Sequence, residues 1–319
     1  MPLAHRHLRT LILLGLAMTP PACVSPAAAD DITSVAAGRP QPLPVVTEHR
    51  YRMMARVRPL LFWISRDDVG GARITWRGNG SDATGLELLI GSDPAKAPRH
   101  INKWGYVSEE VRGNDAHLLG VMKQSNDTSI EDAQAEIAAD GHDYVFKAIS
   151  GAASTREAQA QVTTVRAPRD FTYHDLEPLL QLLGSARNTG TAKSIAMVPG
   201  TRPGFLLALA ELIAGSVDAS HAVRGASMPR TIPYVYNGSR HELTLRKTDF
   251  RRSVQIGGRQ FADVVHAQFE TRSLAAGETT RFELAYGTAG PLAGVPVHAI
   301  YQPRWWFEVQ LFLDETMRF

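Results

Sequence analysis

Two histidine-aspartate pairs, His142-Asp143 and His174-Asp175, hold the side chains best suited to acid-base chemistry or metal binding. An imidazole can act as a general acid or base, and a nearby carboxylate orients it. Neighbours along a strand point to opposite faces, however, and a metal site needs further ligands from elsewhere in the chain. We therefore interpret both pairs as surface or helix-capping residues. The alternative is an unfamiliar hydrolase or lyase that uses His142 or His174.

The short motifs that identify common exported hydrolases do not occur in this sequence. Gly-x-Ser-x-Gly and His-Glu-x-x-His are absent, and no Ser-x-x-Lys stands in a suitable setting. The single cysteine, Cys23, lies in the N-terminal leader described below, so the mature chain offers no thiolate nucleophile and no disulfide. We predict no catalytic residue, no metal and no cofactor, and we favour binding over catalysis while enzymatic activity stays open.

A row of arginines is more informative. Residues 50–58 alternate with period two, so that one face of the predicted strand carries Tyr51, Met53, Ala55 and Val57 and the other carries Arg50, Arg52, Arg56 and Arg58. Guanidinium groups bind the oxygens of phosphates or anionic headgroups. The alternative is a solvated outer face, with arginines paired to carboxylates on the neighbouring strand.

Aromatic residues form two further candidate binding groups. Asn102, Trp104 and Tyr106 belong to a segment flanked by Pro and Gly, and they either line a ligand pocket or anchor a long loop. The second group is Tyr301, Arg304 and Trp306. In a strand over residues 305–313 the adjacent Trp rings point to opposite faces, so we expect Trp305 in the core and Trp306 exposed or covered by a loop. Arg304 could stack on Trp306.

Three helices are predicted. The pattern favours a peripheral helix over residues 129–141 and an amphipathic helix over residues 171–183, the latter capped by Thr172 and Asp175. The third covers residues 204–214 and ends at Gly215. It is apolar on nearly every side, so it must be enclosed, and its residues Phe205 and Leu209 are candidate ligand contacts.

Most of the remaining chain reads as short strands separated by turn residues. A turn at residues 67–71 and a hairpin at Asn237-Gly238 are the clearest connections. Other strands are predicted at residues 86–90, 117–123, 143–149, 158–165, 194–198, 253–256, 260–271, 281–286 and 295–301. Antiparallel pairing fits such short alternating runs, and the concave face of a curved sheet would enclose the apolar helix.

The overall composition is that of an ordinary globular protein. Of the 319 residues 44% are hydrophobic, and 34 basic against 32 acidic residues give a net charge of +2. This charge does not predict nucleic-acid binding.

The N-terminus predicts export. Basic residues precede the apolar run at 11–18 and a small-residue site at 27–29, so we assign residues 1–29 to a cleavable signal peptide for the periplasm. Lipid attachment at Cys23 is the alternative. Residues 30–44 read as a flexible linker and 45–319 as a single β-rich domain, with an alternative boundary in the central helical segment at 167–230. No segment of the mature chain is long enough to span a membrane.

Two short motifs, Asp68-Val69-Gly70-Gly71-Ala72 and Val295-Pro296-Val297, accompany this order of elements. With them the sequence resembles uncharacterised bacterial periplasmic proteins whose curved sheets are similar to lipoprotein-carrier half-barrels. The resemblance implies an apolar cavity for acyl chains beneath a helical lid, and no catalytic residues. The segment 91–112 and the central helical region depart from that pattern.

Together these features predict a soluble, secreted, mainly β protein whose curved antiparallel sheet, or half-barrel, encloses an apolar helix. The predicted function is periplasmic binding or transport of a hydrophobic or amphipathic small molecule or lipid. An envelope assembly or structural protein that binds another protein is the alternative of a different class.

Overall fold

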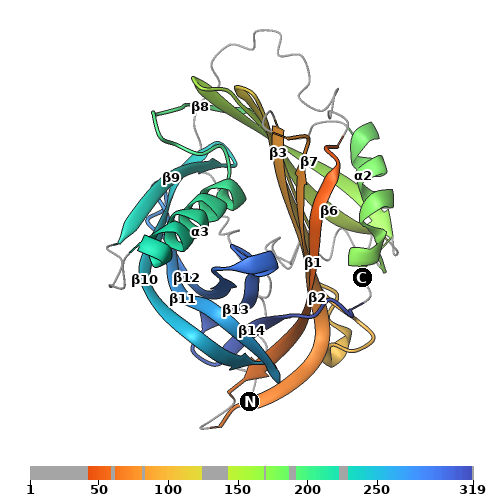
Figure 1. Ribbon diagram of the computed structural model, residues 1–319. Helices are drawn as coiled ribbons and strands as arrows, with labels where there is room; N and C mark the ends of the chain where they lie inside the picture. Colours follow the sequence, from red (N-terminus) through yellow and green to blue (C-terminus); the bar gives the residue numbers. More distant parts are fainter. Residues whose placement is uncertain are drawn as a thin grey trace.

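The computed structural model describes residues 42–58, 62–80, 83–123, 143–168, 170–186, 192–222 and 229–317. Their strands form one antiparallel sheet of 14 strands in the order β8-β7-β6-β5-β4-β3-β2-β1-β14-β13-β12-β11-β10-β9. The sheet curves strongly around a long helix, α3, as Figure 1 shows. The predicted fold class, a mainly β half-barrel around an apolar helix, is confirmed.

The N-terminal half of the sheet comprises β1 (Val45–Val57), β2 (Ile64–Gly78), β3 (Ala83–Ser92), β4 (Trp104–Arg112), β5 (Asp115–Lys123), β6 (Asp143–Ala153), β7 (Glu157–Pro168) and β8 (Lys193–Ala196). The C-terminal half comprises β9 (Arg230–Tyr236), β10 (Ser239–Ile256), β11 (Arg259–Ser273), β12 (Thr279–Gly287), β13 (Pro296–Arg304) and β14 (Phe307–Leu313). The helices are α2 (Leu176–Ser185) and α3 (Phe205–Ala222), with short 3-10 turns at Pro98–His100, Tyr173–Asp175 and Gly290–Leu292.

Pairing between β1 and β14 joins the two halves into one sheet. The register runs from Tyr51 opposite Leu313 to Val57 opposite Phe307. All other neighbours in the sheet are also neighbours in sequence, so hairpins build each half. The first and last strands of the chain therefore meet in the middle of the sheet, and β8 and β9 form its two edges.

The two edges approach each other at one end. The chain beyond β8 crosses to β9, where the Arg202 N–H donates to the carbonyl oxygen of Pro233 at 2.8 Å and the Val235 N–H donates to that of Arg202 at 3.0 Å. A side-chain N–H of Arg240 also donates to the carbonyl oxygen of Ala196, at 2.9 Å. The sheet is unclosed, but these bonds hold its edges together above the N-terminus of α3.

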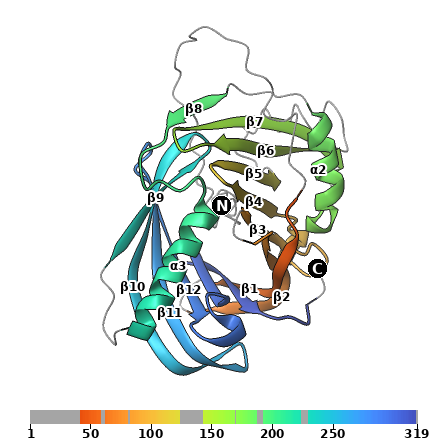
Figure 2. The ribbon, with the colours of Figure 1, turned by 45° about the horizontal axis from the view of Figure 1, so that its top comes forward.

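The helices cover opposite faces of this sheet. Viewed along the half-barrel, α3 lies inside the curve near β9 to β12, whereas α2 lies outside it beside β6 and β7 (Figure 2). We call the concave face, towards α3, the inner face and the convex face the outer face. The predicted helix over residues 171–183 corresponds to α2 and the 3-10 turn before it. The predicted helix at residues 129–141 lies outside the described residues.

The predicted turn at residues 67–71 is wrong, because β2 runs through it without interruption. A Cβ atom on Gly70 would lie 2.1 Å from the carbonyl oxygen of Gly91 on β3, so only glycine allows the two strands to approach this closely. Asp68 adopts a φ of 56°, and the register with β1 shifts between Met53 and Ala55. The irregularity is therefore a β-bulge within a strand.

Helix α3 is longer than predicted. We expected it to end at Gly215, but it continues to Ala222. A Cβ atom on Gly215 would lie 2.1 Å from a guanidinium nitrogen of Arg230 on β9. The glycine therefore serves packing of the helix against the sheet edge rather than termination of the helix.

The predicted hairpin at Asn237-Gly238 is confirmed. Both residues have positive φ, 50° and 63°, and Tyr236 pairs directly with Ser239. A two-residue turn of this kind matches the right-handed twist of the strands that it joins.

Candidate functional site

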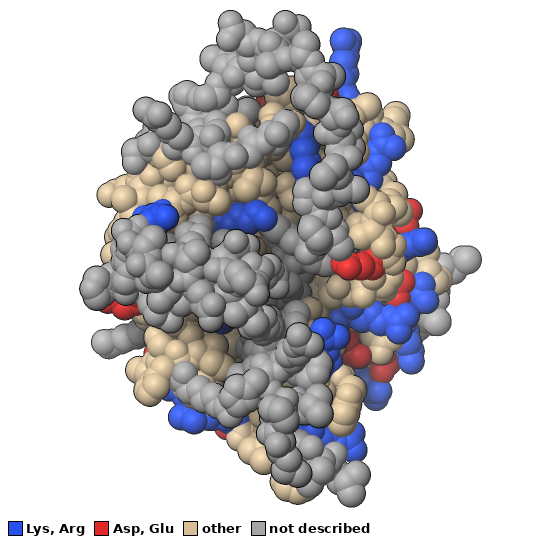
Figure 3. Space-filling model, turned by 180° about the vertical axis from the view of Figure 1, so that it is seen from behind, with Lys and Arg blue, Asp and Glu red and all other residues tan. Residues whose placement is uncertain are grey.

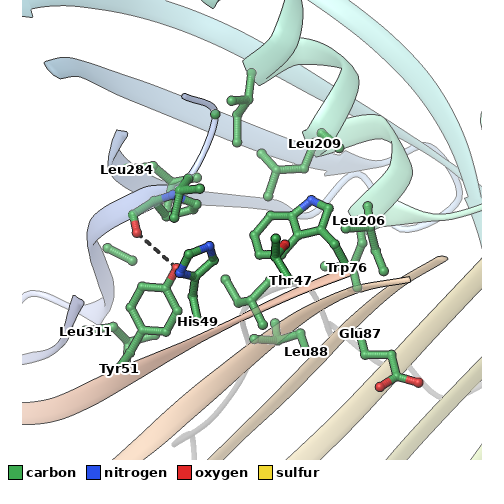
Figure 4. A pocket seen from close by; sticks show the side chains of 18 of the residues that line it. Thr47, His49, Tyr51, Trp76, Glu87, Leu88, Leu206, Leu209, Leu284 and Leu311 are labelled. Atoms are coloured by element: carbon green, nitrogen blue, oxygen red, sulfur yellow. Dashed lines mark hydrogen bonds between the residues drawn. The ribbon is translucent and has the colours of Figure 1, made fainter. Parts of the chain in front are cut away.

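A cavity of about 460 Å³ separates α3 from the opposite wall of the half-barrel. Its size lies within the usual range for small-molecule sites, about 300–1,000 Å³. The side chains that line it come from β1, β2 and β3 on one side, from α3 on the other, and from β12 to β14 at the back (Figure 4). The cavity is thus the space between the enclosed helix and the sheet that encloses it.

Strand alternation explains why the sheet wall of the cavity is mostly apolar. Every second residue of β1 faces inward, namely Thr47, His49 and Tyr51, and the inward residues of β2 and β3 include Ile74, Trp76, Leu86 and Leu88. Glu87 borders this wall, but Figure 4 shows its side chain turned to the other side of the strands. There it pairs with Arg77, at 2.9 Å.

Helix α3 presents apolar residues to two different surroundings. Phe205, Ala208 and Leu212 are buried against the inner face of β9 to β12, in a core that includes Tyr234 and Phe282. On the side that faces the cavity the helix carries Leu206, Leu209, Ala210, Ile213 and Ala214. This arrangement explains why the helix is apolar on nearly every side.

Three side chains place polar atoms on the β1–β2 wall of the cavity: Thr47, His49 and Trp76, which we call the polar wall group. His49 Nδ1 lies 2.6 Å from Glu315 Oε1, and its ring meets that of Trp76 edge to face at 5.6 Å. The neighbouring Tyr51 donates its O–H to the carbonyl oxygen of Pro296, at 2.9 Å. Burial raises the pKa of Tyr51 well above its ordinary value, so this hydroxyl stays protonated.

A buried carboxylate fixes the start of α3. Glu109 projects from β4 across the interior and accepts the N–H groups of Leu206 and Leu207 at 3.0 and 2.9 Å. Burial raises the pKa of Glu109 to about 7, and the N–H bonds at the helix start oppose that rise. A Cβ atom on Gly204 would lie 2.2 Å from this carboxyl group, so the position before the helix requires glycine.

Two predicted site residues, Phe205 and Leu209, line the cavity. Tyr301 lies deeper in the same inner core, where burial raises its pKa to about 12. All three residues therefore lie on the concave side of the sheet, where the cavity is.

The predicted arginine row lies on the outer face, away from the cavity. Arg50 pairs with Glu48 at 2.9 Å, and Arg56 pairs at 3.0 Å with Glu308, directly opposite on β14. Arg52 lies 3.3 Å from the carboxylate of Asp67. The backbone N–H of Arg58 donates to the carbonyl oxygen of Trp306, at 2.7 Å. This geometry agrees with the alternative of an outer face with ion pairs and places the arginines away from the cavity, while their binding of a phosphate or headgroup stays a prediction.

Asn102, Trp104 and Tyr106 also lie away from the cavity, because the segment that we read as a loop leads into β4. Trp104 and Tyr106 are buried beneath α2 on the outer face. The side chains of Asn102 and Trp104 donate to the carbonyl oxygen of Phe171, at 3.0 and 3.2 Å. They therefore anchor the chain that leads into α2, which was the alternative to lining a pocket.

The tandem tryptophans occupy the turn between β13 and β14, which corrects their predicted place in a strand. Trp305 is 67% exposed, whereas Trp306 is partly buried and packs against the core beside Phe307. The assignment of core and surface was therefore reversed. Arg304 is an exposed residue opposite Phe307.

Exposed apolar side chains gather where these strand ends meet. Val57, Phe62, Ile64 and Trp305, which we call the rim patch, are between 37% and 67% exposed. Val57 pairs with Ile64 on one side and with Phe307 on the other, which places the hairpin ends next to each other.

The histidine-aspartate pairs do not form a site in the described residues. Asp175 accepts the N–H of Thr172 at 2.7 Å in a capping box at the start of the helical segment, as predicted, and His174 is exposed. His142 lies outside the described residues. Within the described ranges, no group of three or more His, Cys, Asp or Glu side chains is placed to hold a metal ion.

The described surface mixes charges of both signs. On the face shown in Figure 3, Lys and Arg lie beside Asp and Glu. Exposed arginines of β10 and β12 pair with Glu270, for example, which Arg246 reaches at 3.6 Å and Arg281 at 2.7 Å.

Sequence reasoning missed all three residues of the polar wall group. Thr47 and His49 continue the same alternation that placed Tyr51 inward, so the signal was present and was not extended far enough towards the N-terminus. Glu109 had no such signal, since nothing local distinguishes it from the adjacent Glu110.

Comparison with known proteins shows two distant likenesses. No family model matches the sequence, and no curated protein matches it. A solved beta-barrel-like protein of a domain of unknown function from Brucella abortus is similar, with a TM-score of 0.40, 9% identity, and coverage of 86% of this chain and 98% of that chain. A "putative lipoprotein" from Parabacteroides distasonis has a TM-score of 0.27 and 10% identity, with coverage of 84% and 95%. At these TM-scores neither likeness carries an argument about this chain.

The search for membrane-spanning helices gave a negative result for the part of the chain that the structure describes. None of its helices combines the length and the apolar character that a crossing requires.

Proposed function

We propose that this protein binds or carries a hydrophobic or amphipathic molecule in the cavity beside α3. The observation that carries the proposal is that cavity itself, about 460 Å³, with leucine, isoleucine and aromatic side chains on every wall. We further propose that the chain acts in the periplasm, because residues 1–29 have the pattern of a cleavable signal peptide.

The hydrophobic effect supports an apolar occupant. Leu206 and Leu209 of α3 line the cavity and are only partly buried against the neighbouring core, and Ile74 and Leu88 line it from the sheet. A ligand that fills this space removes their apolar surface from water, which stabilises the complex by about 25 cal/mol for each Å² buried. The site therefore selects ligands by the apolar area that they can bury.

Two acidic groups near the cavity, Glu87 and Glu109, support binding rather than catalysis, while a third, Glu315, pairs with His49 of the cavity wall. Glu87 turns away from the cavity to pair with Arg77, and the carboxylate of Glu109 accepts N–H groups at the start of α3. A general acid or base must reach the reacting atoms from an open position. Both carboxylates instead have structural partners.

The test is titration with the apolar fluorescent probe N-phenyl-1-naphthylamine. The wild-type protein should bind about one probe molecule, and Leu209→Trp, which places an indole in the cavity, should weaken binding at least about tenfold. Leu182→Trp is the matched control, because Leu182 is 37% exposed on α2 at the outer face. Equal binding by all three proteins would place the probe elsewhere and contradict the proposal.

A second candidate function, an envelope protein that binds another protein, is favoured by the rim patch. Contiguous exposed apolar residues are typical of protein contact sites. Phe62 and Trp305 are the most exposed members of the patch, at 61% and 67%. If this function holds, one particular envelope protein should be retained by the wild type and by Leu182→Ser, and lost with the double variant Phe62→Ser, Trp305→Ser. Retention by all three proteins would contradict it.

A further inference from the structure

We infer that the cavity selects amphiphiles whose polar end is an uncharged hydroxyl, and that it discriminates against ligands ending in a carboxylate or a phosphate. This inference rests on the proposed function and specifies its ligand class. It is drawn from the polar wall group, from its one ionic partner and from the distribution of cations around the cavity.

The three polar side chains lie close together because of strand register. Thr47 pairs with Trp76 across β1 and β2, and His49 pairs with Ile74, the next inward position. Figure 4 shows all three facing the same space, opposite Leu206 and Leu209 of α3. Around them the cavity is lined by apolar residues such as Leu284 and Leu311. A ligand can therefore place one small polar group here and must be apolar elsewhere.

Glu315 determines which hydrogen bond His49 can offer. Its carboxylate lies 2.6 Å from Nδ1, and a carboxylate accepts hydrogen bonds, so Nδ1 bears the proton. In the neutral ring Nε2 then has a free lone pair and acts as an acceptor. A hydroxyl matches either state of the ring, because it can donate to Nε2 of the neutral ring and accept from Nε2–H of the protonated ring, whereas an ionised carboxylate can only accept.

The charges near His49 also disfavour an anion. With the ring neutral, the pair of His49 and Glu315 carries one negative charge, and with the ring protonated the pair is neutral overall. Among the described residues that line the cavity there is no Lys or Arg. The arginines adjacent to these wall positions lie on the outer face, where Arg50 and Arg73 share the carboxylate of Glu48 and Arg77 pairs with Glu87. A buried anion would meet no cation other than the His49 ring, whose charge Glu315 already balances, which is unfavourable.

The remaining polar atoms complete a site for a hydroxyl. The Thr47 hydroxyl can donate or accept, and the Trp76 indole N–H can donate. Tyr51 already uses its O–H on the carbonyl oxygen of Pro296. A ligand hydroxyl can donate its O–H to His49 while its oxygen accepts a hydrogen bond from Thr47 or Trp76, so it is satisfied both as donor and as acceptor.

The experiment measures displacement of bound N-phenyl-1-naphthylamine by four ligands with the same tail: decanol, decyl methyl ether, decanoate and decyl phosphate. At about pH 7.5 the last two are ionised. In the wild type, decanol should displace the probe at about tenfold lower concentration than the ether, which cannot donate, and lower still than the two anions.

Two variants connect these differences to named atoms. His49→Leu should bring decanol and its ether to about the same affinity, with the probe still bound. Glu315→Gln should strengthen decanoate binding several-fold, because it removes the negative charge beside the ring. The ether comparison in the wild type needs no variant, so it remains decisive even if His49→Leu fails to fold.

The outcomes separate the two claims. Absence of probe binding would overturn the proposed function. Two other outcomes would overturn the hydroxyl inference and leave the proposed function standing. In the first, the probe binds and decanoate or decyl phosphate displaces it at the same concentration as decanol. In the second, the probe binds and the ether displaces it at the same concentration as decanol.

Discussion

Helices α2 and α3 pack against the same sheet from opposite faces, and they pack differently. Beneath α2, the outer face is filled by large buried side chains, among them Trp104, Phe146 and Leu179. Beside α3, the inner face is filled on one side only, and a cavity of about 460 Å³ separates the helix from β1 to β3. A helix on the convex face meets one apolar surface, whereas a helix inside the curve meets two.

The two helices differ in sequence for this reason. In α2 the buried residues Leu176 and Leu179 share a face with the partly buried Leu180 and Leu183, while Glu177 and Gln181 are exposed. In α3 one side packs on β9 to β12 and the other lines the cavity, so apolar residues surround the helix. An enclosed helix that is apolar all round can therefore indicate a cavity as well as a solid core.

The largest expected effect contrasts the two helix environments directly. Trp104→Ala should lower the free energy of unfolding by about 3–5 kcal/mol, because it leaves a void in close-packed core. Leu209→Ala should cost about 1 kcal/mol, because part of the Leu209 side chain already borders empty space. Urea denaturation of both variants measures the difference, and equal losses would contradict the contrast.

The next effect is a pH dependence of the inner face. The folded pKa of Glu109, about 7, lies above its ordinary value of 4.5, so the folded state binds the proton more tightly than the unfolded state. The stability that this provides is present below pH 4.5 and is lost as the pH rises to about 7, by about 3 kcal/mol at about 1.4 kcal/mol for each pH unit.

Glu109→Gln removes this titration while retaining a similar shape. The free energy of unfolding of the wild type should therefore fall relative to that of Glu109→Gln between pH 4.5 and about 7, and the two curves should run parallel above pH 8. Denaturant titrations at a series of pH values test this, with Glu110→Gln as the control at the adjacent residue. Parallel curves throughout would show that Glu109 does not carry the effect.

A smaller effect tests the contact at the start of α3. Gly204→Ala should cost about 1–3 kcal/mol, because the added methyl group meets the Glu109 carboxylate. In a Glu109→Ala background the same substitution should cost less than about 0.5 kcal/mol, since the carboxylate is gone. Unfolding free energies of the single and double variants form the cycle, and additive costs would refute direct contact.

The smallest effect compares neighbouring residues of β1 on opposite faces. Tyr51→Phe should cost about 1–2 kcal/mol, because it leaves the carbonyl oxygen of Pro296 without its buried donor. Arg50→Ala, on the outer face, should change stability by no more than about 1 kcal/mol, as partly exposed ion pairs contribute little. Thermal and urea unfolding of both variants would detect a reversal of this order, which would contradict the assignment of faces.

The sequence predicted the architecture well because that information is local. Alternation placed Tyr51 and Met53 inward, the Asn237-Gly238 turn was recognisable, and the apolar character of residues 204–214 indicated an enclosed helix. Each of these signals depends on a few neighbouring residues. The fold class, with its strands, its hairpin turn and its enclosed helix, could therefore be predicted without knowing which strands pair.

The site could be predicted only in part, because it depends on contacts between distant segments. Phe205 and Leu209 were assigned to the cavity, since they belong to the enclosed helix. Trp104 and the arginines were candidate ligand-binding residues because of their side-chain chemistry. The alternation of side chains along their strands, and the position of α2, place them on the outer face. The hydrogen bond between Glu109 and the Leu206 N–H joins residues that are nearly a hundred positions apart, and no local sequence pattern predicts it.

The most direct test of the central claim, that the inner face holds an apolar ligand beside α3, is a crystal structure of the protein grown with decanol that carries bromine on its terminal carbon. The account predicts an anomalous bromine signal inside the cavity, near Leu284 or Leu311, with the hydroxyl at His49. A bromine signal confined to the outer face or to the rim patch, with the cavity unchanged, would contradict it.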